Sequence, residues 1–93
     1  MKDLQELRER LDNIDAALVY LLAERFKLSQ DVGHYKKAHQ LPPVDKQREA
    51  AQFARITELA KEAGLDPEYA RKVLRITIDE VVKNHKVIQD ITD

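Results

Sequence analysis

The fold is decided by residues 4–35, which read LQELRERLDNIDAALVYLLAERFKLSQDVGHY. With one exception, an arginine, apolar or aromatic residues recur through this stretch at alternating steps of three and four. Such spacing keeps one stripe of side chains on one side of a helix, as in a coiled coil. The stretch therefore predicts one long helix with a continuous seam, formed by Leu4, Leu7, Leu11, Ile14, Leu18, Leu21, Arg25, Leu28, Val32 and Tyr35.

The length of this helix has a consequence for assembly. A helix from about residue 2 to residue 39 is roughly 57 Å long at 1.5 Å per residue. A compact domain of this size has a radius of gyration of only about 12 Å, so the remaining residues cannot cover the seam. Because a second long helix is needed and another copy of the chain supplies one, we predict an all-α homodimer.

The composition excludes several classes of protein. The 93 residues are 35% charged and 43% apolar, with two glycines, three prolines and no cysteine. They allow one domain at most, without disulfides or thiolate metal sites, and with too few turn residues for a small β fold. The net charge of −1 gives no broad field for binding nucleic acid or an anionic membrane. Since no stretch has a signal core or the roughly 18 to 20 apolar residues of a membrane span, we expect a soluble cytoplasmic protein.

Two short segments carry helix-stop signals, LPPVD and AGLDP. They divide the chain, which we take as one domain of residues 1–93, into three predicted helices. These helices span about residues 2–39, 46–63 and 67–91. We expect both shorter helices to pack against the long one.

The residues at the breaks have specific roles at helix ends. Asp45 and Asp66 suit the N-caps of the second and third helices. Gly64 suits the left-handed position that closes a helix, and Pro67 suits a first helical turn, where its missing N–H costs nothing.

Two cations share one face of the long helix. Arg25 occupies a seam position, where a guanidinium is costly unless it meets an anion or reaches water. The ordinary explanations are that it extends to solvent or pairs with a glutamate of a partner helix. Lys36 follows 11 residues later, which leaves about 20° between the two directions and roughly 16 Å along the axis. Both cations can therefore face one site.

Arg8 lies in a different direction, about 100° from Arg25 and roughly 25 Å away along the axis. It cannot serve the same site within one chain. In an antiparallel dimer it could complete the site of the partner, although a solvated arginine is the simpler interpretation of this residue alone.

The start of the second helix adds further charges, Asp45, Arg48 and Glu49, where backbone N–H groups favour anions. The Pro-Pro loop returns the chain to the Lys36 end of the first helix. Arg48 is then a candidate third cation, and Glu49 a candidate acceptor for a ligand hydroxyl. Gly33 has two explanations, which are close approach of another helix or room for a ligand beside Lys36.

His85 interrupts the apolar stripe of the third helix, where a histidine is more often a core or interface residue than a catalyst. The three histidines lack the spacing of a metal site, and no nucleotide-binding motif is present. Ser29 has no histidine or acid at a spacing that would make it a nucleophile. The cations instead favour a small ligand with two or more carboxylates, bound between helices.

Several runs resemble the AroQ-type, all-helical chorismate mutases, and the resemblance covers nearly the whole chain. The matching residues are 7–15, 21–25, 32–33, 36, 42–45 and 48–49. The resemblance implies an intertwined homodimer with two equivalent sites. It also implies an isomerase of the shikimate pathway and aromatic amino acid biosynthesis, which converts the dicarboxylate chorismate to prephenate without cofactor, metal or covalent intermediate.

The resemblance assigns roles to the cations. Arg25 and Arg48, with Arg8 of the partner subunit, would hold the two carboxylates of chorismate. Lys36 would donate a hydrogen bond to the ether oxygen that breaks. Catalysis would consist of holding the compact conformer and stabilising the charge that develops on that oxygen.

The remaining roles concern the ring hydroxyl and the third helix. Glu49 and the backbone at Asp45 would take the hydroxyl. Val81 stands where many members have a serine or similar polar residue, so it should lose a carboxylate contact. His85 stands where they have a glutamine, the second donor to the ether oxygen. If protonated His85 is that donor, kcat/KM should fall as pH rises.

Other functions fit the same residues. An isochorismate pyruvate-lyase and an aminodeoxychorismate mutase use the same scaffold, although Glu49 argues mildly against the lyase. A non-catalytic helical dimerisation module is also possible, with Arg25 paired by an acid of the partner and the other cations solvated.

Overall fold

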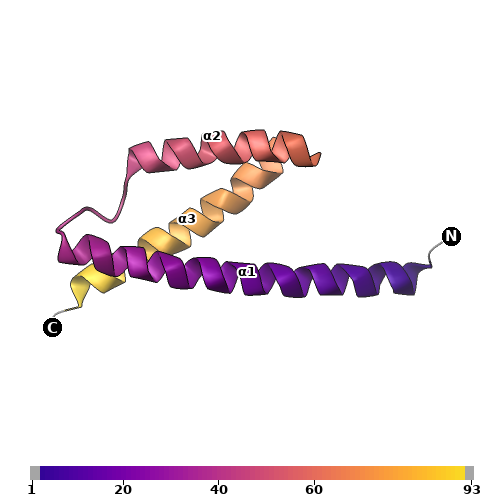
Figure 1. The fold of residues 1–93 in the computed structure, drawn as a ribbon, viewed down its shortest axis with the longest axis horizontal. Coiled ribbons are helices and arrows are strands. Elements are labelled where there is room, and N and C mark those ends of the chain that lie inside the picture. Colours follow the sequence, from indigo (N-terminus) through magenta and orange to yellow (C-terminus); the bar gives the residue numbers. More distant parts are fainter. Residues whose placement is uncertain (1–2, 92–93) are drawn as a thin grey trace.

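The computed structural model describes residues 3–91, which form three α-helices and no strand within that range. The helices are α1 (Leu4–Ala38), α2 (Lys46–Ala63) and α3 (Pro67–Asp90), as Figure 1 shows. The all-α prediction of one long and two shorter helices is therefore confirmed. The expected start of the first helix at residue 2 lies outside the described residues.

The ends of α2 and α3 follow from their sequences. The side chains of Asp45 and Asp66 each accept a hydrogen bond of 3.0 Å from a backbone N–H of the first turn. Pro67 lies in the first turn of α3, and Gly64 closes α2 with a φ of 73°, which glycine adopts without strain. The predicted roles of these four residues are confirmed.

Helix α3 holds the other two helices together. It runs diagonally from the end of α2 to the C-terminal end of α1 and contacts both (Figure 1). Within residues 3–91, α1 and α2 do not pack against each other. The expectation that both shorter helices pack against the long one is thus right for α3 and wrong for α2. The reason is that α3 carries the strongest apolar stripe, with Leu74, Ile78 and Ile88 buried, so it offers a surface to both neighbours.

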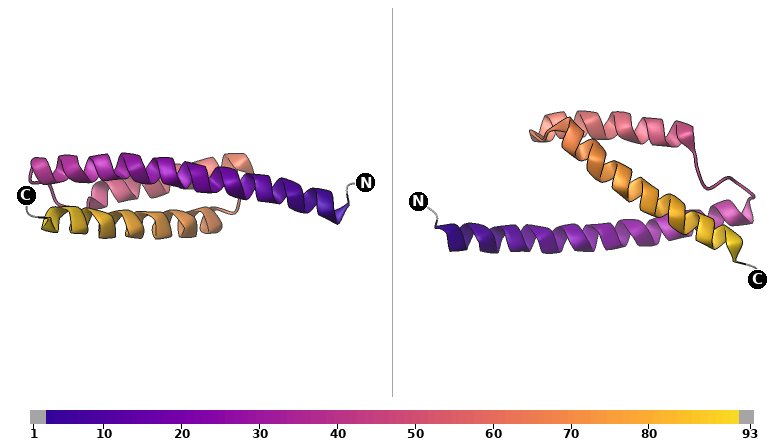
Figure 2. Two further views of the ribbon diagram at one scale, coloured as in Figure 1. Left: turned by 90° about the horizontal axis from the view of Figure 1, so that it is seen from below. Right: turned by 180° about the vertical axis from the view of Figure 1, so that it is seen from behind.

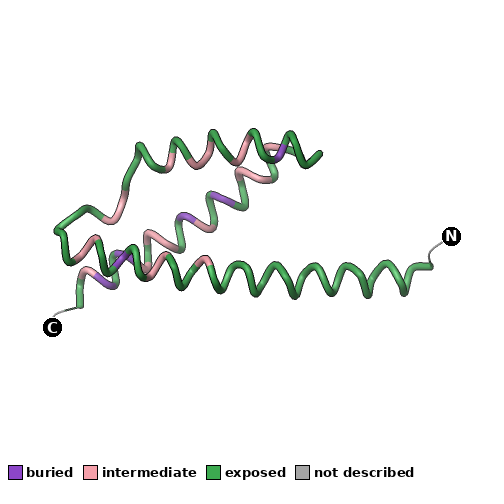
Figure 3. Tube along the Cα trace, viewed as in Figure 1, coloured by how far each residue is buried: buried purple, intermediate pink, exposed green. Residues whose placement is uncertain are grey.

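The N-terminal half of α1 is uncovered. Both views in Figure 2 show it extending past the other helices, and Figure 3 shows it exposed throughout. Ile14 and Leu21 of the seam are 64% and 68% exposed. The radius of gyration is 16.9 Å, against about 12 Å for a compact domain of this length. One chain alone therefore leaves most of its apolar seam facing solvent. No helix in the described part of the chain is long and apolar enough to cross a membrane.

Gly33 marks the place where α3 comes closest to α1. It is the buried residue of α1, and a Cβ atom there would lie 2.7 Å from Cδ2 of His85 and 2.9 Å from Cδ1 of Ile88. Real Cβ atoms do not approach other atoms so closely, so the absence of a side chain is required. Close approach of another helix is thus the correct explanation of Gly33, and the alternative of open space for a ligand is wrong.

Candidate functional site

A cavity of about 320 Å³ is lined by residues of all three helices, and we call it the cationic cavity. Three of its lining residues are cations, two from α1 and one from α2. The complete lining consists of Arg25, Leu28, Ser29, Val32, Lys36, Arg48, Gln52 and Val81. Sequence reasoning therefore identified four of the lining residues, namely Arg25, Lys36, Arg48 and Val81.

Helix geometry and the loop after α1 bring the cations together. Arg25 and Lys36 line the cavity from one face of α1, as their spacing requires. The Lys36 ammonium donates to the carbonyl of Pro43 at 3.2 Å, which fastens the loop to the end of α1. This loop leads to the Asp45 cap, and Arg48 follows in the first turn of α2. The Asp45 cap fixes the start of α2 and therefore the position from which Arg48 reaches the cavity.

The electrostatics of the cavity favour an anion. None of the ion pairs among residues 3–91 uses Arg25, Lys36 or Arg48, and no carboxylate lines the cavity. Arg25 and Lys36 are half-buried, so their charges are only partly solvated. Partly desolvated cations without a counter-charge attract an anionic ligand strongly. The geometry suits a small molecule with more than one negative group.

Glu49 does not line the cationic cavity. Its carboxylate lies on the other side of α2, where Oε1 is 3.2 Å from Nη2 of Arg75. Arg75 also bonds Asp79 and lies over the ring of Phe53, 5.4 Å from the centroid. Hydrogen bonding to Asp79, followed by that to Glu49, raises the pKa of Arg75. Glu49 and Asp45 thus have structural partners here, as an ion pair and as a helix cap.

His85 lies behind the cavity rather than in its wall. The imidazole is only 3% exposed, and its Nε2 atom is 2.8 Å from the carbonyl oxygen of Ser29 and 3.2 Å from its hydroxyl. Nδ1 is buried without a partner among the described residues. The ring is therefore held in the contact between α1 and α3, against Gly33.

Arg8 lies on the exposed N-terminal part of α1 and does not line the cavity. Its distance from Arg25, roughly 25 Å along the helix axis, agrees with the expectation that it cannot serve this site within one chain.

Two polar lining residues, Ser29 and Gln52, were not identified as site residues from the sequence. The spacing of both residues in the sequence could have identified them. Ser29 follows Arg25 by four residues, and Gln52 follows Arg48 by four, so each lies one helical turn from a cation on the same face.

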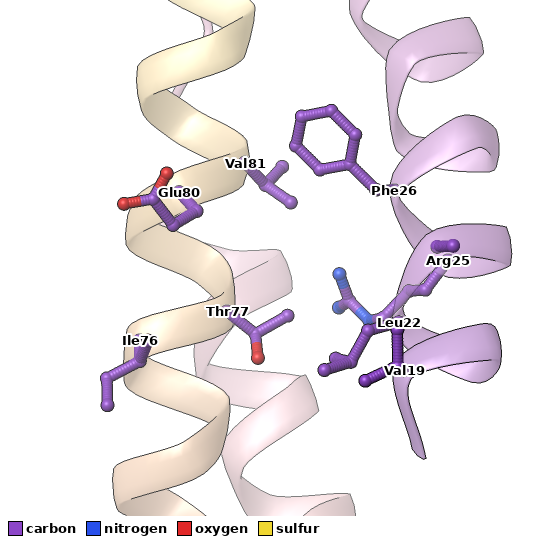
Figure 4. A pocket seen from close by; sticks show the side chains of 9 residues that line it. Val19, Leu22, Arg25, Phe26, Ile76, Thr77, Glu80 and Val81 are labelled. Atoms are coloured by element: carbon purple, nitrogen blue, oxygen red, sulfur yellow. The ribbon is translucent and has the colours of Figure 1, made fainter. Parts of the chain in front are cut away.

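An apolar groove of about 470 Å³ adjoins the cationic cavity between α1 and α3. Figure 4 shows Leu22 and Phe26 of α1 pointing toward Thr77 and Val81 of α3. Arg25 and Val81 line both hollows, so the groove continues into the cavity. Its full lining is Val19, Leu22, Ala23, Arg25, Phe26, Ile76, Thr77, Glu80 and Val81. Within the described residues no group of histidine and carboxylate side chains could hold a metal ion.

Comparison with known proteins identifies the family to which this chain is similar. Residues 7–86 match the family model described as chorismate mutase type II. A chorismate mutase of Methanocaldococcus jannaschii is 34% identical over 79 residues, which are 85% of this chain and 80% of that protein. A 4-amino-4-deoxychorismate mutase of Streptomyces pristinaespiralis is 34% identical over 86% of this chain and 62% of its own length. A bifunctional chorismate mutase/prephenate dehydratase of Escherichia coli (strain K12) is 32% identical over 91% of this chain, but the match spans only 22% of that protein.

Proposed function

Because this chain belongs to the type II chorismate mutase family, we propose that it is an isomerase that rearranges chorismate to prephenate in the cationic cavity. The observation that carries the proposal is the set of three cations without ion-pair partners in the described range, which converge from two helices on a cavity free of carboxylates. Chorismate carries two carboxylates, so it fits this charge. The volume of about 320 Å³ suits a ligand of that size.

The reaction is intramolecular and requires no nucleophile or general acid–base residue from the protein. In the [3,3] rearrangement the ether C–O bond breaks while a C–C bond forms between the enolpyruvyl terminus and the ring, and no proton changes place. Catalysis then consists of holding the reactive conformer and of stabilising negative charge on the ether oxygen. Arg25 and Arg48 hold the carboxylates, and Lys36 donates to the ether oxygen. The bond from Lys36 to the Pro43 carbonyl keeps the ammonium at the cavity.

The site is completed by a second copy of the chain. The exposed seam of α1 and the apolar groove beside it are surfaces that a partner helix would cover. In an antiparallel arrangement the N-terminal half of one α1 lies over the groove of the other chain. Arg8 of the partner subunit then reaches the cationic cavity as a fourth cation. The functional unit that we propose is a homodimer with two sites.

Glu49 accepts the ring hydroxyl in this proposal, with the backbone at Asp45. For that, the Glu49 carboxylate leaves Arg75, which is 46% exposed and keeps Asp79 as its other partner. The Glu49 side chain is only 13% exposed, so its carboxylate needs a partner, and the substrate hydroxyl takes the place of the guanidinium as that partner. A carboxylate also suits a ring amine, and the Streptomyces relative makes 4-amino-4-deoxychorismate the second candidate substrate.

The test is turnover of chorismate by the wild-type protein and by Lys36→Ala, followed by loss of chorismate absorbance. Loss of the donor to the ether oxygen should reduce kcat about 100- to 1000-fold. Lys27→Ala is the matched control, because Lys27 lies on the same helix and pairs only with exposed Glu24. Isochorismate and 4-amino-4-deoxychorismate are assayed in parallel. Full activity of Lys36→Ala, or no turnover of chorismate by the wild type, would contradict the proposal.

A further inference from the structure

Ser29 is a polar residue in the lining of the cationic cavity, and none of the roles described above uses it. Ser29 is half-buried and lines the cavity one turn after Arg25 and two turns before Lys36. A polar side chain between two cations is well placed to contact whatever the cations bind.

The protonation of His85 determines what the hydroxyl can do. A carbonyl oxygen only accepts hydrogen bonds, so the 2.8 Å contact with the Ser29 carbonyl requires that Nε2 of His85 carries a proton. Nε2 then has no lone pair to accept from the Ser29 hydroxyl, which lies 3.2 Å away and can only share the same proton as a second acceptor. The hydrogen of the Ser29 hydroxyl therefore remains available to a third partner.

The two threonines in the helices of residues 3–91 behave differently from Ser29. Thr57 and Thr77 each donate to the carbonyl four residues earlier, both at 2.8 Å, which is the usual local bond of a hydroxyl in a helix. Among the described residues, Ser29 makes no such bond, and its hydroxyl contacts only His85. Its hydrogen is thus not used by the fold.

The arrangement depends on Gly33. The Ser29 carbonyl is the helical acceptor for the N–H of Gly33, and its second lone pair receives the His85 ring. Since the ring lies within 3.2 Å of where a Cβ of Gly33 would be, any side chain there would move it. Gly33, His85 and Ser29 thus form one unit that ends at the cavity wall.

We propose that Ser29 is a further substrate-binding residue, whose hydroxyl donates to a substrate oxygen between the groups held by Arg25 and Lys36. His85 is the positioning residue that holds Ser29 in this orientation from behind. This inference rests on the proposed function, because the donor needs a bound anionic substrate. In this inference His85 does not donate to the ether oxygen itself but holds Ser29, which is the donor to the substrate.

The experiment is a double-mutant cycle measured as kcat/KM for chorismate, with Ser29→Ala, His85→Leu and their combination. Ser29→Ala should lower kcat/KM about 10- to 100-fold, as expected for a hydrogen bond to a charged ligand. If His85 acts through Ser29, the combination is no worse than the poorer single variant. His85→Gln should restore most of the activity, because the amide can donate to the same carbonyl.

Two outcomes would overturn the inference: Ser29→Ala keeping kcat/KM within about twofold of wild type, or effects that multiply in the combination, as expected for independent residues. Thr57→Val is the matched control, since it also removes one hydroxyl that bonds a backbone carbonyl, away from the cavity. Circular dichroism and gel filtration establish folding first. If His85→Leu does not fold, Ser29→Ala and His85→Gln decide the question.

A binding measurement separates failure of this inference from failure of the proposed function. Glutarate, a small dicarboxylate, should raise the melting temperature of the wild type and raise that of Ser29→Ala less. If the wild type does not turn over chorismate, the proposed function fails, and this comparison still tests the Ser29 donor. Equal shifts in the two proteins, or no shift in either, would count against it.

Discussion

The two halves of α1 carry the same apolar pattern and lie in different surroundings. The C-terminal half, with Gly33 buried, packs against α3 and contributes Arg25 and Lys36 to a cavity. The N-terminal half meets no other helix for most of its length, and Leu18 is 50% exposed. One half of the seam is thus satisfied by the chain itself. The other half is left for the second chain of the homodimer that we propose, and Arg8 lies on it.

The C-terminal half of α1 therefore contributes to the stability of the single chain, whereas in our proposal the N-terminal half contributes to completing the site. The short core, around Leu74, Ile78 and Ile88, fixes α3 on its neighbours and shapes the cationic cavity. The uncovered half adds nothing to that core. Its contribution, in our proposal, is to hold two chains together and to carry one more cation to the substrate of the other chain.

The largest effect is expected from a charge on the uncovered seam. Leu18→Glu places a carboxylate where the partner helix packs, and burying it unpaired is very costly. The dimer should dissociate, and chorismate turnover should fall by about 1000-fold or more, because each site loses its fourth cation along with its cover. Light scattering after gel filtration and the absorbance assay measure both effects.

Tyr20→Glu is the control for this variant. Tyr20 is 75% exposed and lies about 200° around the helix from Leu18, away from the seam. It should remain dimeric and active. A dimeric Leu18→Glu protein would show that the uncovered half of α1 is not the interface.

The next largest effect is expected from the two arginines that, in our proposal, come to one cationic cavity from different chains. Arg8→Ala and Arg25→Ala should each reduce kcat/KM about 100- to 1000-fold. When the two variants are unfolded together and refolded, half of the dimers contain one of each chain. In these, one site combines the intact Arg25 with the intact Arg8 of the partner subunit, so activity should recover to about a quarter of the wild-type level. No recovery would place Arg8 outside the partner's site.

A smaller effect is expected at the contact within the chain. Gly33→Ala gains helix propensity, worth about 1 kcal/mol, but its methyl group collides with His85 and Ile88. The free energy of unfolding should fall by about 1 to 2 kcal/mol, measured by urea denaturation at fixed protein concentration. Asp31→Ala, at an exposed position two residues earlier, should change it by less than about 0.5 kcal/mol. A stabilised Gly33→Ala protein would mean that α3 can move away from α1.

Sequence reasoning was most successful where one rigid element decides the geometry. The spacing of Arg25 and Lys36 places them on one face of α1 whatever the rest of the chain does, and both line the cationic cavity. The same holds for the helix ends, where Asp45, Gly64 and Asp66 act through local backbone geometry. Ser29 could have been found by the same rule, since it lies one turn from Arg25.

The sequence was insufficient where the rotation of one helix against another decides the geometry. A shift of one residue turns a side chain by about 100°, so packing determines whether Glu49 faces the cavity or Arg75. His85 is a similar case, because the missing side chain of Gly33 lets its ring reach the α1 backbone. Neither position can be obtained from one helix alone.

The smallest effect is expected at Arg75, which bears on whether Glu49 is available to substrate. In Arg75→Gln the Glu49 carboxylate, which is only 13% exposed, loses its charged partner, so the melting temperature should fall modestly. Glu49 then needs no exchange of partners to accept the ring hydroxyl, so kcat/KM should be equal to or a few-fold above the wild-type value. Lys72→Gln, at another exposed position on α3, is the control. A marked loss of activity in Arg75→Gln alone would show that the ion pair positions α2, and that Glu49 serves the fold rather than the substrate.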